Sequence, residues 1–115
     1  MKIWIIEGRC GHYPEEEEWY VCAYSNQMHA EAHAFAAADE AIEIQQKLIA
    51  LQQQSADMSK ADYWRKEERI RESSKFDPKM EVDTMNCPWY IVDKVDLRDE
   101  FDPQNGDALS GEDQS

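Results

Sequence analysis

An uninterrupted helical pattern from Asn26 to Gln54 constrains the fold of this chain more than any other feature. Apolar residues recur through it at helical spacing, and neither Gly nor Pro interrupts it. At ~1.5 Å of rise per residue, a single helix over this stretch would be roughly 40 Å long. That is longer than a small sheet can cover, so we expect its glutamine-rich end to extend past the core or to pair with another helix.

Four short stretches outside this helix predict strands: three have β-branched and aromatic residues, and Met80–Asp83 alternates apolar and acidic residues. The first two predict a hairpin with a long acidic tip. After the long helix, Ser59 and Asp62 fit the capping pattern that starts a helix, so a second helix is expected over Lys60–Ser73. The four predicted strands are Lys2–Glu7, Trp19–Tyr24, Met80–Asp83 and Trp89–Arg98.

The predicted order is therefore strand, strand, helix, helix, strand, strand. Its compact solution is an α+β fold in which a helical hairpin packs on one face of an antiparallel sheet of three or four strands. Residues 1–98 are expected to form a single domain, because a chain of 115 residues leaves no room for a second one. Residues 99–115 contain six acids and no bases, and we expect this tail to be disordered.

Helices on only one face of the sheet would leave aromatic residues on the other. An uncovered aromatic face favours a partner or a homodimer, and the alternative is that loops or the second helix fold over it. The aromatic residues from which such a face would be drawn are Trp4, Tyr20, Tyr24, Trp89 and Tyr90.

The formal net charge of −13 indicates which partners the chain can have. Nucleic acid and anionic membranes repel so acidic a protein, so a basic protein surface is the favoured partner. The alternative is that the acids only keep the protein soluble. Three cysteines cannot all pair with one another, and the apolar N-terminal stretch is too short for a signal peptide or a membrane span. The sequence thus predicts a cytoplasmic protein with reduced thiols.

The densest run of charge is four consecutive glutamates directly before Trp19. If these carboxylates and the acids of the long helix formed one negative ridge, they would imitate a phosphate backbone and occupy a nucleic-acid groove on another protein. The alternative is an ordinary solvated loop. The predicted partner-binding residues are Glu15, Glu16, Glu17, Glu18, Trp19, Asp39, Glu40 and Glu43.

His29 and His33 lie four residues apart on one face of the long helix, which is the spacing that two zinc ligands need. Cys22, near the start of that helix, is the better placed third ligand among Cys10, His12, Cys22 and Cys87. The alternative is two ordinary histidines beside a buried cysteine. The pair Cys10 and His12 lacks an orienting third group, and the common catalytic motifs are absent. The sequence therefore predicts neither an enzyme nor a cofactor.

Four features lie toward the two ends of the chain: Lys2-Ile3-x-Ile5-x-Glu7-Gly8, Trp19-x-Val21-x-Ala23-Tyr24, an Ala- and His-containing helix start, and Phe76-Asp77-Pro78-x-Met80-x-Val82-Asp83. Together they resemble a family of small phage-encoded proteins of uncharacterised function. The chain departs from that pattern at Cys10-Gly11-His12 and at Cys87-Pro88. The resemblance implies a phage accessory protein, and it transfers no catalytic residues.

Charge, spare aromatic residues and this resemblance together predict a phage accessory protein that binds and inhibits a host protein with a basic surface. The favoured target is a nucleic-acid-handling defence complex, which would make the chain an anti-CRISPR-like inhibitor that mimics nucleic acid. The alternatives from other classes are a zinc-binding protein built on His29 and His33, and a virion or assembly component.

Overall fold

The computed structural model describes residues 1–11, 14–101 and 103–104. All three strands of this part of the chain are antiparallel and form one sheet in the order β2-β1-β3. The α+β class is therefore confirmed. The elements in chain order are β1 (Lys2–Cys10), β2 (Glu17–Tyr24), α1 (Gln27–Gln54), the short 3-10 helix η1 (Ser55–Asp57), α2 (Lys60–Arg71) and β3 (Trp89–Asp96).

The long helix α1 forms as predicted and has two different halves. Asn26 caps its start by accepting a hydrogen bond from the His29 amide at 3.2 Å. The first half of its buried face is made of alanines, which let the sheet approach closely, and the second half has larger side chains that fill the space beside α2. The buried residues of α1 are Ala30, Ala34, Ala37, Ala41, Ile44, Leu48 and Leu51.

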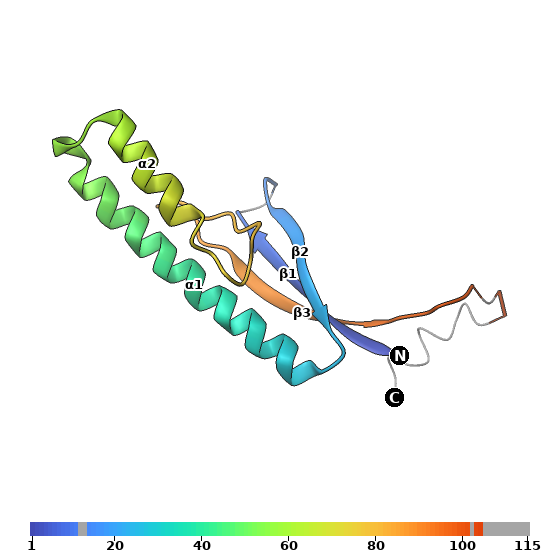
Figure 1. Ribbon diagram of the computed structural model, residues 1–115. Helices are drawn as coiled ribbons and strands as arrows, with labels where there is room; N and C mark the ends of the chain where they lie inside the picture. The colour runs from blue at the N-terminus through green and yellow to red at the C-terminus, as the bar shows by residue number, and fades with distance from the viewer. Residues whose placement is uncertain (12–13, 102, 105–115) are drawn as a thin grey trace.

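The second helix α2 is also capped as predicted, because Ser59 accepts a hydrogen bond from the Asp62 amide at 3.2 Å. It has no fully buried residue. Ile70 is its main contact with the cluster of Ile44 and Leu48 on α1. The predicted packing of a helical hairpin on the sheet is thus confirmed only in part: α1 packs on the sheet, while α2 lies along α1 beyond it (Figure 1).

The prediction of a fourth strand over Met80–Asp83 is wrong, because in the part of the chain that the structure describes this segment pairs with no strand. Its carbonyl groups are used elsewhere. The Val82 carbonyl accepts a hydrogen bond from Arg71 of α2, and the Asp83 carbonyl accepts one from Gln45 of α1 at 3.1 Å. Helix side chains therefore satisfy the backbone that a strand ladder would otherwise have used.

The two faces of the sheet differ in what covers them. Trp4 and Ile6 of β1 point toward α1, and Ile6 is fully buried against Ala30 and Ala34. Because side chains alternate along a strand, Ile5 and its neighbours at odd positions lie on the opposite face. Figure 1 shows α1 and α2 on the first side of the sheet, so no helix of the described residues covers this outer face.

Candidate functional site

An open pocket of about 670 Å³ lies between the β1–β2 hairpin and the segment that precedes β3. Carboxylates approach it from both walls: Glu15 and Glu17 from the hairpin, and Glu81 and Asp83 from the opposite segment. Arg71 of α2 also lines it. The pocket therefore brings together acids from two distant parts of the chain.

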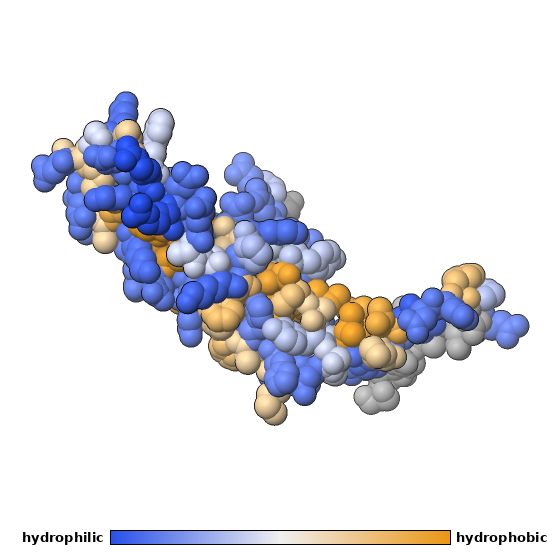
Figure 2. Space-filling model, viewed as in Figure 1, coloured by the Kyte–Doolittle hydropathy of each residue, from blue (hydrophilic) through white to orange (hydrophobic). Residues whose placement is uncertain are grey.

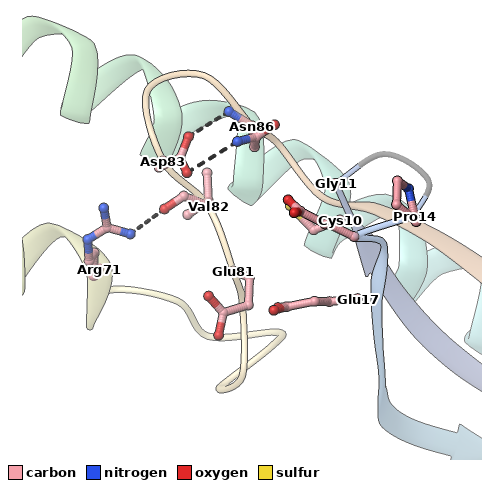
Figure 3. A pocket seen from close by; sticks show the side chains of 10 residues that line it. Cys10, Gly11, Pro14, Glu17, Arg71, Glu81, Val82, Asp83 and Asn86 are labelled. Carbon is pink, nitrogen blue, oxygen red and sulfur yellow. Dashed lines mark hydrogen bonds between the residues drawn. The ribbon is translucent and has the colours of Figure 1, made fainter.

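Two of these acids come from opposite walls of the pocket. Figure 3 shows the Glu17 side chain extending toward the segment that carries Glu81, whose own carboxylate projects away from Glu17. Neither side chain has a hydrogen-bond or ion-pair partner among the residues that the structure describes. Arg71 is already engaged, since it donates to the Val82 carbonyl and, through Nε, to Glu67 at 3.4 Å. Glu17 and Glu81 are thus carboxylates to which a cation at the pocket would be attracted.

Asp83 has a different role in the same wall. Its carboxylate accepts hydrogen bonds from the amides of Met85 at 2.7 Å and Asn86 at 2.6 Å, which closes the turn after the segment. Burial by itself would raise the pKa of Asp83, but these hydrogen bonds outweigh it and lower the pKa below its usual range. Asp83 therefore stays ionised and fixes the wall that carries Glu81.

Cys10 borders the pocket but is unsuited to nucleophilic chemistry. Burial raises the pKa of its thiol, and the negative charges of Asp83, Glu17 and Glu81 raise it further. A protonated thiol is a weak nucleophile. His12, the predicted neighbour of Cys10 in a catalytic pair, lies outside the described residues. The lining of the pocket thus consists of carboxylates beside a thiol whose pKa is raised.

The predicted acidic ridge is divided in the structure. Glu15 and Glu17 line the pocket, and all four hairpin glutamates, Glu16 and Glu18 included, are exposed. Glu18 forms an ion pair with Arg9 at 3.7 Å. The helix acids lie elsewhere, since none of Asp39, Glu40 and Glu43 lines the pocket.

The helix acids also differ among themselves. Asp39 and Glu43 are exposed, and Glu43 pairs with Lys47 at 3.3 Å. Glu40 holds the loop after α2, because its carboxylate accepts the Ser74 hydroxyl at 2.7 Å and the Lys75 amide at 2.9 Å. Glu40 therefore has a structural task that the sequence did not indicate.

Asp77 is the residue that sequence reasoning missed. Pro78 disfavours a helical conformation at Asp77, so Phe76-Asp77-Pro78 has the local pattern of a turn, but Asp77 is fully buried. Its carboxylate accepts hydrogen bonds from Trp19 Nε1 at 2.9 Å, Tyr90 Oη at 2.7 Å and the Lys79 amide at 3.0 Å. Trp19, a predicted partner contact, therefore points inward, and an acid in a turn motif gives no sequence signal of burial.

The predicted zinc ligands do not converge on a metal site. His33 Nε2 lies 2.7 Å from the Phe76 carbonyl, which can only accept, so this nitrogen carries the proton. The Nδ1 atom of a neutral ring then accepts from Tyr24 Oη at 2.8 Å. Cys22 Sγ is 3.8 Å from both ring nitrogens, and burial raises the pKa of its thiol. His29 is exposed one turn earlier. Within the described ranges, no three His, Cys, Asp or Glu side chains are grouped to hold a metal.

No protein-family model, curated protein or solved structure matches this chain. Across the described residues, no helix combines the length and the apolar character needed to cross a lipid bilayer. The chemistry of the chain's own surfaces is therefore the guide to what it binds.

Proposed function

We propose that this chain is a protein-binding module that inhibits a basic, nucleic-acid-handling host protein, as an anti-defence accessory protein of a phage would. The observation that carries the proposal is that Glu17 and Glu81, which line the pocket from opposite walls, have no hydrogen-bond or ion-pair partner among the described residues. A Lys or Arg side chain of a partner would form charge-assisted hydrogen bonds with these carboxylates.

The exposed glutamates beside this pair support the same partner. Glu15 and Glu16 lie next to Glu17 at the open end of the hairpin, in a chain whose net charge is −13. A groove that binds nucleic acid responds at long range to negative charge, whether phosphate or carboxylate carries it. The hairpin would therefore be attracted to such a groove and would exclude nucleic acid from it.

Binding explains these residues better than catalysis does. The thiols of Cys10 and Cys22 both have raised pKa values, so neither is a ready nucleophile. Nucleic acid itself is a poor ligand for a chain with this charge. The favoured activity is inhibition by occupancy in the host cytoplasm.

The proposal is tested by affinity capture from a bacterial lysate at 50 mM and 500 mM NaCl, followed by mass spectrometry. We expect a basic nucleic-acid-binding protein to be retained at 50 mM, released at 500 mM and displaced by added double-stranded DNA. The variant with Glu15, Glu16, Glu17 and Glu18 all changed to Gln should capture at least tenfold less of this partner than wild type does, because it lacks the negative charge that attracts a basic groove.

A matched variant controls for the loss of net charge. Asp57→Asn, Glu68→Gln, Glu72→Gln and Glu100→Gln together remove the same number of charges at exposed positions outside the hairpin. This variant should retain the partner. Absence of any basic partner at 50 mM NaCl, or equal loss in the two variants, would refute the proposal.

A further inference from the structure

The outer face of the sheet is a second candidate for a binding surface. The pairing of β1 with both neighbours defines it: Ile3 lies opposite Val95, Ile5 opposite Ala23 and Asp93, and Glu7 opposite Tyr20 and Ile91. Residues paired in this way share a face. The larger apolar side chains of this outer face are Ile3, Ile5, Tyr20, Ile91 and Val95.

These apolar residues range from half-buried to exposed, with Ile3, Ile5 and Ile91 half-buried. Tyr20 is 66% exposed and Val95 is 39% exposed. Figure 2 shows strongly hydrophobic residues in a row along the strands, with hydrophilic surface over the helices beside them. A contiguous apolar patch of this kind on a small protein commonly marks a contact surface.

Two carboxylates lie near the centre of the outer face. Glu7 of β1 pairs with Ile91 of β3, and Asp93 of β3 pairs with Ile5 of β1. Glu7 and Asp93 are therefore diagonal neighbours on adjacent strands. The Glu7 side chain is only 15% exposed. Its one cationic neighbour in the described chain is Arg9, at 3.5 Å, and Arg9 also pairs with Glu18. Burial, and then the Asp93 carboxylate, raises the pKa of Glu7. Two acids held close together among aliphatic side chains are poorly compensated within the chain.

We propose that the outer face docks an apolar surface of a basic protein and receives one of its Lys or Arg side chains between Glu7 and Asp93. This inference rests on the proposed function, since it supplies the apolar part of the same contact. Continuity supports it, because the ion pair of Arg9 with Glu18 joins the outer face to the acidic hairpin.

Charge also selects this occupant over a second copy of the chain. Two outer faces packed around a two-fold axis would bring two pairs of Glu7 and Asp93 into one dry interface, where uncompensated like charges are costly. A basic side chain would instead neutralise the pair. The homodimer through the sheet face is therefore the disfavoured outcome.

Selection from a random twelve-residue peptide library displayed on filamentous phage tests the inference without knowledge of the host partner. We expect enriched peptides in which Lys or Arg is flanked by apolar residues. Their NMR chemical-shift changes should map to the backbone around Ile5, Glu7 and Asp93. The Glu7→Gln/Asp93→Asn variant should bind such peptides at least tenfold more weakly, because it removes both charges.

Two further variants separate this surface from the hairpin. The variant with all four hairpin glutamates changed to Gln should keep peptide binding, whereas Tyr20→Ala should weaken it several-fold. If the hairpin variant loses the lysate partner while peptides still bind the sheet, both proposals stand. If lysate capture fails but the peptides bind the outer face as expected, only the proposed function fails.

Three results would overturn the inference: no enrichment of peptides, enriched peptides without a basic residue, or shift changes that map elsewhere. A fourth overturning result would come from analytical ultracentrifugation, in which we expect a monomer. A dimer whose contact maps to the outer face would show that a second copy of the chain, and not a basic protein, occupies this face.

Discussion

At the scale of single residues, Asp77 holds the sheet and the loop before β3 together. We expect Asp77→Ala to lower the free energy of unfolding by about 3 kcal/mol, since it leaves the Trp19 and Tyr90 donors without their buried acceptor. Asp77→Asn should cost less, because its amide oxygen can still accept from both side chains, although its NH2 group cannot accept from Lys79. Urea unfolding followed by tryptophan fluorescence measures the difference.

Asp39→Ala is the matched control for this substitution. Asp39 is exposed, so its removal should change the free energy of unfolding by no more than about 0.5 kcal/mol. An Asp77→Ala variant as stable as Asp39→Ala would contradict the role assigned to the buried carboxylate. Partial burial and the Asp77 carboxylate also raise the pKa of Tyr90, so its hydroxyl remains a donor to Asp77.

The hydrogen bonds of Glu40 predict the direction in which the stability of the fold changes with pH. Burial alone would raise the pKa of Glu40, but hydrogen bonds from Ser74, Lys75 and Phe76 outweigh it and hold the pKa below the usual 4.5. A lowered carboxyl pKa stabilises the fold above about pH 4.5, and this stabilisation is lost as the pH falls through the folded-state pKa. The stability advantage of wild type over Glu40→Gln should therefore be constant near pH 6–7 and shrink toward pH 3.

Urea midpoints measured between pH 3 and pH 7 check this expectation. Glu43→Gln is the control one turn away, where an exposed ion pair with Lys47 contributes little. A wild-type advantage over Glu40→Gln that grew toward pH 3 would show that the carboxylate is not stabilised by the loop.

At the scale of elements, β1 depends on a glycine that the sequence reasoning placed at its end. β1 continues through Gly8 to Cys10, and a Cβ atom at position 8 would lie 2.5 Å from the ring of Trp19 on β2. Ala normally stabilises a strand relative to Gly. Here we expect Gly8→Ala to lower the free energy of unfolding by about 1–3 kcal/mol, because the indole must move away from Asp77.

A double-mutant cycle isolates that contact. In a Trp19→Phe background the smaller ring leaves more room, so Gly8→Ala should cost clearly less than in wild type. Urea unfolding followed by far-ultraviolet circular dichroism suits all four proteins, because it does not depend on Trp19. If Gly8→Ala lowered the free energy of unfolding equally in the two backgrounds, contact with the Trp19 ring would not be the reason that position 8 requires glycine.

The elements differ in how well the sequence predicted them, for a physical reason. α1 and the cap at Ser59 were predicted because helix periodicity and capping depend on residues a few positions apart. Met80–Asp83 alternates like a strand, but the partners of its carbonyl groups lie on helices far away in the chain. Local pattern therefore could not decide its structure.

The candidate site was predicted unevenly for the same reason. The four hairpin glutamates are visible in the sequence as a run of charge. Glu81 is a single acid in an unrelated stretch, and only the fold brings it to the same pocket as Glu17. Glu40 was predicted to face a partner, although its true partners are amides of a loop that follows the next helix.

At the scale of the whole molecule, the net charge of −13 opposes the compact state. The ion pairs that the structure describes are mostly exposed, as with Lys47 and Glu43 at 3.3 Å or Arg65 and Asp62 at 3.5 Å, and such pairs contribute little. Screening of the long-range repulsion should therefore outweigh the weakening of these pairs when salt is added.

We accordingly expect the melting temperature to rise by about 2–5 °C between 20 mM and 500 mM NaCl. The variant with Gln at all four hairpin glutamate positions has less charge to screen, so it should melt higher at 20 mM NaCl and gain less from added salt. Differential scanning calorimetry of both proteins at four salt concentrations gives the comparison. A wild-type melting temperature that falls with salt would mean that ion pairs, and not repulsion among surplus carboxylates, dominate the electrostatics of this fold, and the cationic partner would then lose its physical basis.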